Sequence, residues 1–209
     1  QVACGGRRGR AGGASGRASG PPPPSTMVGF SAAGGFALRL ASSAQQGLFQ
    51  HYLLLSPFIH QDAPTYRDGA GGWVSIGLPR IIALTVINQF GITAFNHLPV
   101  SAFALNEAAR DLLTPSYSYN LATNFRPRHD WRNDLRAARQ PMAVLVGADD
   151  EAFHADRFAQ VFALARQPVP VTLLPATGHA GLTLQPAAIN AAVAAVRQLG
   201  GGEGGTAPQ

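Results

Sequence analysis

The sequence contains a single cysteine, no lysine and few charged residues of any kind. Cys4 alone cannot form an internal disulfide, and it excludes a metal site built from several cysteines. Only 13% of the 209 residues are charged, whereas 46% are hydrophobic, and the mean hydropathy is +0.04. The apolar runs are well short of the ~20 residues that a transmembrane helix needs. These features exclude a disordered or collagen-like chain and predict one domain with a sizeable core.

The basic character of the chain comes mostly from its first residues. All 16 basic residues are arginine, and four of them lie within residues 1–26, where there is no acid. The remaining sequence has 12 Arg against 11 Asp and Glu, so its formal charge is +1. Because the excess charge is confined to one short segment, the pI near 10.3 does not indicate a nucleic-acid-binding protein.

Both ends of the chain have compositions typical of flexible segments. Residues 1–26 are rich in Gly, Arg and Ser, contain a run of four prolines and lack the apolar stretch of a signal peptide. Residues 200–209 have five glycines in their first six positions. We expect two disordered tails around a domain that spans residues 27–199. The single cysteine and the absence of a signal peptide favour a cytoplasmic location.

Between these tails, apolar runs alternate with helical patterns. Strands are expected at residues 27–30, 51–56, 143–146 and 169–174, and helices at residues 32–46, 130–139, 151–166 and 186–199. Residues 57–130 lose this rhythm and mix Gly, Pro, aromatic residues and short apolar runs. Because buried strands separated by helices are typical of parallel sheets, the pattern predicts an α/β fold whose mostly parallel sheet is covered on both faces.

The first expected strand ends in Gly29-Phe30-Ser31-Ala32-Ala33, directly before a helical pattern. A sharp strand-to-helix turn needs small residues two positions on either side of the serine, and Gly29 and Ala33 meet that requirement. The helix N-terminus behind Ser31 would stabilise a developing oxyanion. An ordinary Gly-rich turn with a helix-capping serine would give the same pattern.

Two further polar groups follow later strands. Asp149 and Asp150 come after the strand at 143–146, and His179 comes after the strand at 169–174 and a short loop. Open α/β sheets place their functional sites at the carboxyl ends of strands. Taken singly, each group has an ordinary explanation as a turn aspartate or a surface histidine. The other histidines have no comparable setting and no spacing that suggests a metal site: His51, His60, His97, His129 and His154.

The order Ser, Asp, His, with each residue at the end of a strand, resembles the α/β-hydrolase family. The likeness covers about residues 28–199 and is closest to the lysophospholipase- and monoacylglycerol-lipase-like esterases. Gly29-Phe30-Ser31 with Gly34-Gly35-Phe36 resembles the nucleophile elbow and its helix, Gly147-Ala148-Asp149-Asp150 the acid turn, and Gly178-His179 the histidine loop. The resemblance implies a partial α/β-hydrolase fold with a helical cap at residues 57–130, inserted before the acid strand.

The same resemblance implies the chemistry of a serine esterase. Ser31 would attack an acyl carbonyl to form an acyl-enzyme, His179 would transfer the proton, and Asp150 would orient His179, with Asp149 as the alternative acid. The backbone N–H of Ala32 would be one oxyanion donor. No metal or organic cofactor is required. The apolar residues of the cap favour hydrophobic, acyl or lipid-like esters as substrates.

The residues before Gly29 do not resemble the strands that precede the nucleophile in this family, nor the loop among them that donates the second oxyanion N–H. We therefore keep a second hypothesis, that the chain is a catalytically incompetent hydrolase fragment or a binding module for an apolar ligand. Within the first hypothesis, an acyltransferase or a peroxyacid-forming enzyme would use the same triad. Neither a nucleic-acid partner nor stable membrane insertion is expected, and the oligomeric state is left open.

Overall fold

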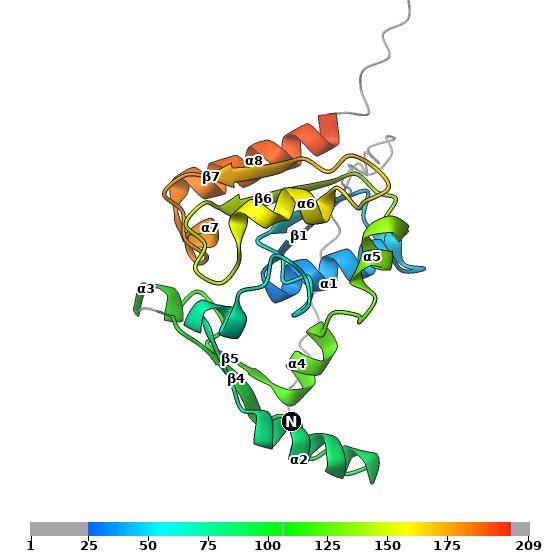
Figure 1. Cartoon of the computed structure of the whole chain (residues 1–209), viewed down its shortest axis with the longest axis vertical. Helices are drawn as coiled ribbons and strands as arrows, with labels where there is room; N and C mark the ends of the chain where they lie inside the picture. Colours follow the sequence, from blue (N-terminus) through cyan, green and yellow to red (C-terminus); the bar gives the residue numbers. More distant parts are fainter. Residues whose placement is uncertain (1–24, 106, 202–209) are drawn as a thin grey trace, which may run out of the picture.

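A four-stranded parallel sheet with helices on both faces forms the larger part of the computed structural model, which describes residues 25–105 and 107–201 (Figure 1). Its strand order is β1-β2-β6-β7, and every neighbouring pair is parallel. The four strands are β1 (Thr26–Phe30), β2 (His51–Leu55), β6 (Met142–Gly147) and β7 (Val171–Leu174). The central strands β2 and β6 are buried at every residue, which explains their continuous apolar sequences.

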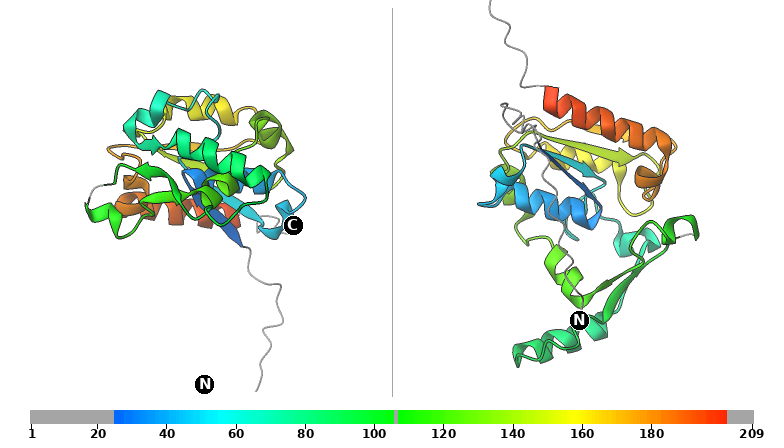
Figure 2. Two further views of the ribbon diagram at one scale, coloured as in Figure 1. Left: turned by 90° about the horizontal axis from the view of Figure 1, so that it is seen from below. Right: turned by 180° about the vertical axis from the view of Figure 1, so that it is seen from behind.

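Side chains alternate between two cores, one on each face of the sheet. On one face, Leu54 and Val144 pack in a cluster with residues of three helices: α1 (Ala32–Ala41), α5 (Trp131–Ala137) and α6 (Phe158–Phe162). On the other face, Leu53 and Leu145 pack with residues of α7 (Gly181–Leu184) and α8 (Pro186–Gly201). Figure 2 shows α8 and α1 on opposite sides of the sheet. The structure thus confirms the predicted parallel sheet covered on both faces.

Strand β1 lies at one edge of the described sheet and is less well covered than β2. Val28 of β1 pairs with Leu53 of β2, so both side chains point to the face that α8 occupies. Helix α8 contacts β2 and β6, whereas α1 contacts β1 from the opposite face. Val28 is therefore 50% exposed, while Leu53 is fully buried.

Most of the segment between β2 and β6 forms a separate layer below the sheet in Figure 1, whereas its last helix, α5, packs on the sheet. It contains the 3-10 helix η2 (Asp68–Gly72) and the helices α2 (Leu78–Gln89), α3 (Glu107–Arg110) and α4 (Tyr119–Phe125). It also contains an antiparallel sheet of β3 (Val74–Ile76), β4 (Pro99–Phe103) and β5 (Ser116–Ser118). The expectation of a helical cap did not include this sheet, because its strands mix polar and apolar residues and lack the continuous apolar runs of the buried parallel strands.

Several element boundaries differ from the predicted ones. The helix expected over residues 151–166 is reduced to a 3-10 turn, η3 (Ala155–Arg157), followed by α6. The helix expected to reach residue 46 ends at Ala41 and is followed by η1 (Gln46–Leu48). Strand β1 begins at Thr26 and α8 continues to Gly201, and residues 1–24 and 202–209 of the predicted tails lie outside the described residues. Within residues 25–105 and 107–201, no helix combines the length and hydropathy needed to cross a bilayer.

Candidate active site

Ser31 occupies the turn between β1 and α1 in a backbone conformation that serine rarely adopts. Its φ is 51° and its ψ is −118°, values that favour glycine. The Ser31 N–H donates to the carbonyl of Leu55 at 2.9 Å, and the Ser31 carbonyl accepts from the N–H groups of Gly35 and Phe58 at 3.1 and 2.9 Å. These bonds to β2, to α1 and to the loop after β2 hold the strained turn in place.

Small residues around Ser31 allow three segments to approach one another closely. A Cβ on Gly29 would lie 2.5 Å from the carbonyl oxygen of Ala33, and a Cβ on Gly34 would lie 2.8 Å from the Cβ of Pro57. A Cβ on Gly35 would collide with the carbonyl of Phe58. The tight packing of β1, α1 and the loop after β2 therefore requires these glycines.

His179 joins Ser31 to Asp150 through hydrogen bonds from both ring nitrogens. Its Nε2 lies 3.0 Å from Ser31 Oγ, and its Nδ1 lies 2.9 Å from Asp150 Oδ2. Ser31, Asp150 and His179 follow β1, β6 and β7, whose carboxyl ends meet at one edge of the sheet. Asp149, the alternative acid, is exposed, and the structure brings Asp150 rather than Asp149 to the ring of His179.

The carboxylate of Asp150 is buried, yet it is held in its charged form. Burial acts to raise the pKa of Asp150, but the hydrogen bond and charge of His179 outweigh it. With help from the Phe153 N–H, the pKa lies below its ordinary value. Asp150 Oδ1 accepts hydrogen bonds from the N–H groups of Ala152 and Phe153 at 2.8 and 2.9 Å. The carboxylate is therefore suited to stabilise a protonated His179.

The ring of His179 is enclosed by aromatic side chains. Its centroid lies 4.7 Å from that of Phe30, 4.9 Å from that of Trp73 and 5.2 Å from that of Phe153. His179 is fully buried as a result. Because these rings restrict the orientations of the imidazole, they complement the hydrogen bonds that fix its position.

Glu151 is a site residue that the sequence analysis did not identify. Its Oε2 accepts a hydrogen bond of 2.8 Å from the backbone N–H of His179. In the sequence, only its position directly after Asp150 could have indicated a role in the site. An acidic residue there is also typical of the first turn of a helix. Phe153 was missed for a related reason, since its apolar side chain fits the pattern of a helix core.

Ser31 borders two hollows between the sheet and the segment inserted between β2 and β6. The first hollow has a volume of about 220 Å³ and the second of about 440 Å³. Both are lined by the same four aromatic side chains in addition to Ser31: Trp73, Phe103, Tyr117 and Phe125. The remaining walls are also largely apolar, with Ile76, Ile81 and Val100 in the first hollow. Leu105, Leu112 and Leu113 line the second. Ser31 is thus surrounded by surfaces that suit an apolar molecule.

Ala32 is placed at the first position of α1, where a helix leaves its N–H groups without intrahelical acceptors. It also lines the first hollow beside Ser31. This position agrees with the oxyanion donor expected there, because a positive helix end and a free N–H both favour negative charge.

Comparisons with known proteins were informative at the level of structure. The sequence matches no protein family and no curated protein. A monoacylglycerol lipase from Paleococcus ferrophilus is similar over 85% of this chain and 68% of its own, with a TM-score of 0.57 and 14% identity. A soluble variant of monoglyceride lipase from Saccharomyces cerevisiae, solved with a substrate analog, matches over 84% of this chain and 61% of its own (TM-score 0.58, 15% identity).

A third similar structure is a putative aryl esterase from Burkholderia cenocepacia. It matches over 85% of this chain and 65% of its own length, with a TM-score of 0.52 and 16% identity. The chain therefore spans 61 to 68% of the length of these three proteins. At such low identity, the comparison establishes a shared fold.

Proposed function

We propose that this chain, which has the α/β-hydrolase fold, is a serine hydrolase that acts on carboxylic esters. The observation that carries the proposal is the continuous chain of hydrogen bonds from Ser31 Oγ through His179 to Asp150. In this chain Ser31 is the nucleophile, His179 is the base, and the carboxylate of Asp150 orients the base, as covalent catalysis by serine requires. The strained turn at Ser31 and the adjoining apolar hollows support the same function.

The proposed reaction proceeds through an acyl-enzyme. Ser31 Oγ attacks the carbonyl carbon of the ester while His179 Nε2 takes the hydroxyl proton. The bond from carbon to the leaving oxygen then breaks, and His179 returns the proton to the departing alcohol. A water molecule repeats the sequence, releasing the acid and restoring Ser31. Asp150 holds the imidazole in the tautomer that leaves Nε2 free to accept a proton, and it stabilises the imidazolium that forms.

The N–H of Ala32 is proposed to stabilise the negative charge that develops on the carbonyl oxygen. Donors of this kind act where water is excluded. In a protease, removing one of them lowers the turnover number by a factor of about 10²–10³. The position of Ala32 at the start of α1 adds the favourable field of the helix N-terminus.

The surroundings of Ser31 favour hydrophobic esters as substrates. Aromatic and aliphatic side chains line both hollows, and the charged side chain of Arg126 lies in the wall of the first. Burial of an apolar acyl group against such walls contributes about 25 cal/mol per Å² of apolar surface. Two of the similar structures are lipases for monoglycerides, which agrees with an acyl or lipid-like ester.

Labelling with a fluorophosphonate probe tests the proposal, with circular dichroism to show that the chain is folded. The reagent phosphonylates serines that are activated by a neighbouring base, so we expect labelling at Ser31 that is abolished in Ser31→Ala. Ser75→Ala, which removes an exposed hydroxyl from β3, is the matched control and should be labelled normally. A folded wild-type chain that remains unlabelled would contradict the proposal.

The alternative is a non-catalytic module that binds an apolar ligand in the hollows beside Ser31. It is favoured by the apolar lining of both hollows, which would suit a bound ligand whether or not the serine reacts. This alternative predicts that apolar esters raise the melting temperature of the chain without being hydrolysed. Hydrolysis of nitrophenyl esters that depends on Ser31 would exclude it.

A further inference from the structure

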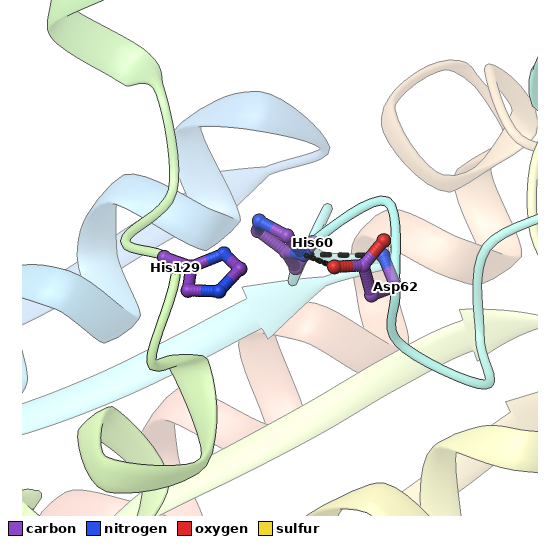
Figure 3. A group of neighbouring side chains, drawn as sticks. All are labelled: His60, Asp62 and His129. Carbon is purple, nitrogen blue, oxygen red and sulfur yellow. Dashed lines mark hydrogen bonds and ion pairs between the residues drawn. The ribbon is translucent and has the colours of Figure 1, made fainter.

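A second cluster of chemically reactive side chains lies beside the first hollow, whose wall includes one of them, His60. His60 and Asp62 belong to the loop after β2, and His129 belongs to the segment between α4 and α5 (Figure 3). In the figure the ring of His129 points toward that of His60. None of the three has a part in the proposed hydrolysis. His129 lies far from His60 and Asp62 in sequence, and the spacing of the histidines alone indicated no metal site.

The three side chains are spaced closely enough to share one ion. One ligand atom from each lies within 4.8 Å of the other two. His60 Nδ1 is 3.5 Å from Asp62 Oδ2, and the centroids of the two imidazole rings are 5.7 Å apart. Bonds of about 2.1 Å to a tetrahedral ion place its ligand atoms about 3.4 Å apart. The cluster therefore needs to contract by up to about 1.4 Å at its widest separation.

Two of the three side chains, those of Asp62 and His129, are exposed and can move to achieve this contraction. The side chain of Asp62 is 60% exposed and His129 is exposed, whereas the side chain of His60 is 8% exposed and held in place. His60 Nδ1 accepts a hydrogen bond of 3.1 Å from the backbone N–H of Asp62, and an ion bound at Nδ1 would replace this bond. Because His60 is buried, it provides the fixed ligand to which the other two can adjust.

We propose that His60, Asp62 and His129 bind a divalent transition-metal ion such as Zn²⁺. Two imidazoles and one carboxylate form a ligand set that Zn²⁺ accepts readily, with water in the fourth position. Hard cations such as Mg²⁺ prefer sites made of oxygen atoms. The site is distinct from Ser31, His179 and Asp150.

The local charges act in both directions on a bound cation. The Asp62 carboxylate supplies negative charge and favours the ion, whereas the nearby Arg126 and Arg132 disfavour it. Asp62 is therefore the ligand whose charge matters most to the proposed site.

A metal at this position would connect the two ends of the segment inserted between β2 and β6. The loop after β2 contributes Phe58 and Tyr66 to the first hollow, and the segment before α5 contributes Arg126 and Pro127. The ion would cross-link these two walls through His60 and His129. Because the ion binds the folded chain and not the unfolded one, we expect Zn²⁺ to raise the melting temperature.

Isothermal titration of the full chain with ZnCl₂ tests the site, with Cys4→Ser in every protein and no polyhistidine tag. We expect one Zn²⁺ per chain, a higher melting temperature with Zn²⁺ and no response to Mg²⁺. His129→Ala and Asp62→Asn should each weaken binding tenfold or more. Both alter exposed side chains, so the folded state should be preserved, and circular dichroism verifies this.

The exposed His97 provides the matched control, because His97→Ala removes an imidazole that lies outside the cluster. Its zinc affinity should equal that of the wild type. Ser31→Ala should also bind Zn²⁺ normally, which separates this site from the proposed ester hydrolysis. Zinc binding that is absent, or that is unchanged in both His129→Ala and Asp62→Asn, would overturn the proposal.

Discussion

The backbone N–H of His179 donates a 2.8 Å hydrogen bond to Glu151 Oε2, while the ring of the same histidine binds the neighbouring Asp150. Two consecutive acids after β6 thus hold one histidine, one through its main chain and the other through its side chain. This arrangement brings the loop after β7 against the loop after β6. The position of His179 relative to Ser31 depends on both contacts.

Glu151→Ala should lower turnover of a nitrophenyl ester by on the order of tenfold, because His179 loses a positioning contact and shifts away from Ser31. Glu151→Gln keeps an oxygen acceptor and should stay close to the wild type. Steady-state kinetics measure both, with Asp149→Ala as the control for loss of a neighbouring exposed acid. Equal rates for Glu151→Ala and Asp149→Ala would show that the contact does not position His179.

Asp150 should make the stability of the chain depend on acid pH. Its pKa is lowered in the folded state, so the unfolded chain binds more protons between the folded pKa and the unfolded value of about 3.9. Its contribution to the free energy of unfolding is complete above that value and is lost as the pH falls through the folded pKa.

Asp150→Asn removes this titration, so its free energy of unfolding should decrease less steeply than that of the wild type from pH 5 to pH 3. Urea denaturation at a series of pH values measures the slopes. Asp149→Asn is the matched control at the adjacent exposed position. Identical slopes for the wild type and Asp150→Asn would contradict the prediction.

Ser31→Gly should be more stable than Ser31→Ala. Residue 31 has a positive φ of 51°, which glycine adopts freely and alanine does not. Strain of this kind costs about 1–3 kcal/mol, so we expect the free energy of unfolding to differ by about 1–2 kcal/mol in favour of glycine. Both variants lack the hydroxyl, which removes any difference in the bond to His179. Urea denaturation at neutral pH measures both free energies of unfolding. A Ser31→Gly variant that is less stable than Ser31→Ala would contradict the backbone strain inferred at residue 31.

His51→Leu should stabilise the chain. His51 is fully buried in β2, and neither ring nitrogen has a hydrogen-bond partner among the described residues. Burying an unpaired polar group costs about 1–3 kcal/mol, so an apolar side chain of similar size should raise the free energy of unfolding by about 1 kcal/mol. His97→Leu, at an exposed position, should change it by less than about 0.5 kcal/mol. A destabilised His51→Leu variant would reveal a partner for the ring.

The parallel sheet and the placement of three polar side chains at its edge were predictable from the sequence. His51–Leu55 and Met142–Gly147 are buried on both faces, and such strands carry continuous apolar runs that mark their ends. Once the strands are parallel, the residues that follow them must share one edge. This is why Ser31, Asp150 and His179 could be expected to meet, although their role in catalysis is a proposal.

Contacts between loops were not predictable in the same way. The bond from His179 to Glu151 and the approach of His129 to His60 depend on how irregular segments pack, and no periodicity records that. The shortened helix after β6 has a related cause. The carboxylate of Asp150 binds the N–H groups of Ala152 and Phe153 and holds them in a turn, despite an apolar pattern that favours a helix.

The span of sequence between Ser31 and His179 has a consequence for the newly made chain. The two residues are hydrogen-bonded but 148 positions apart. At about 5–20 residues per second, a ribosome takes roughly 7–30 s to travel from the first to the second. Throughout that interval the serine has been synthesised and the histidine that would activate it has not. If the proposed triad operates, the nascent chain therefore remains unreactive toward esters until the loop that carries His179 has been made.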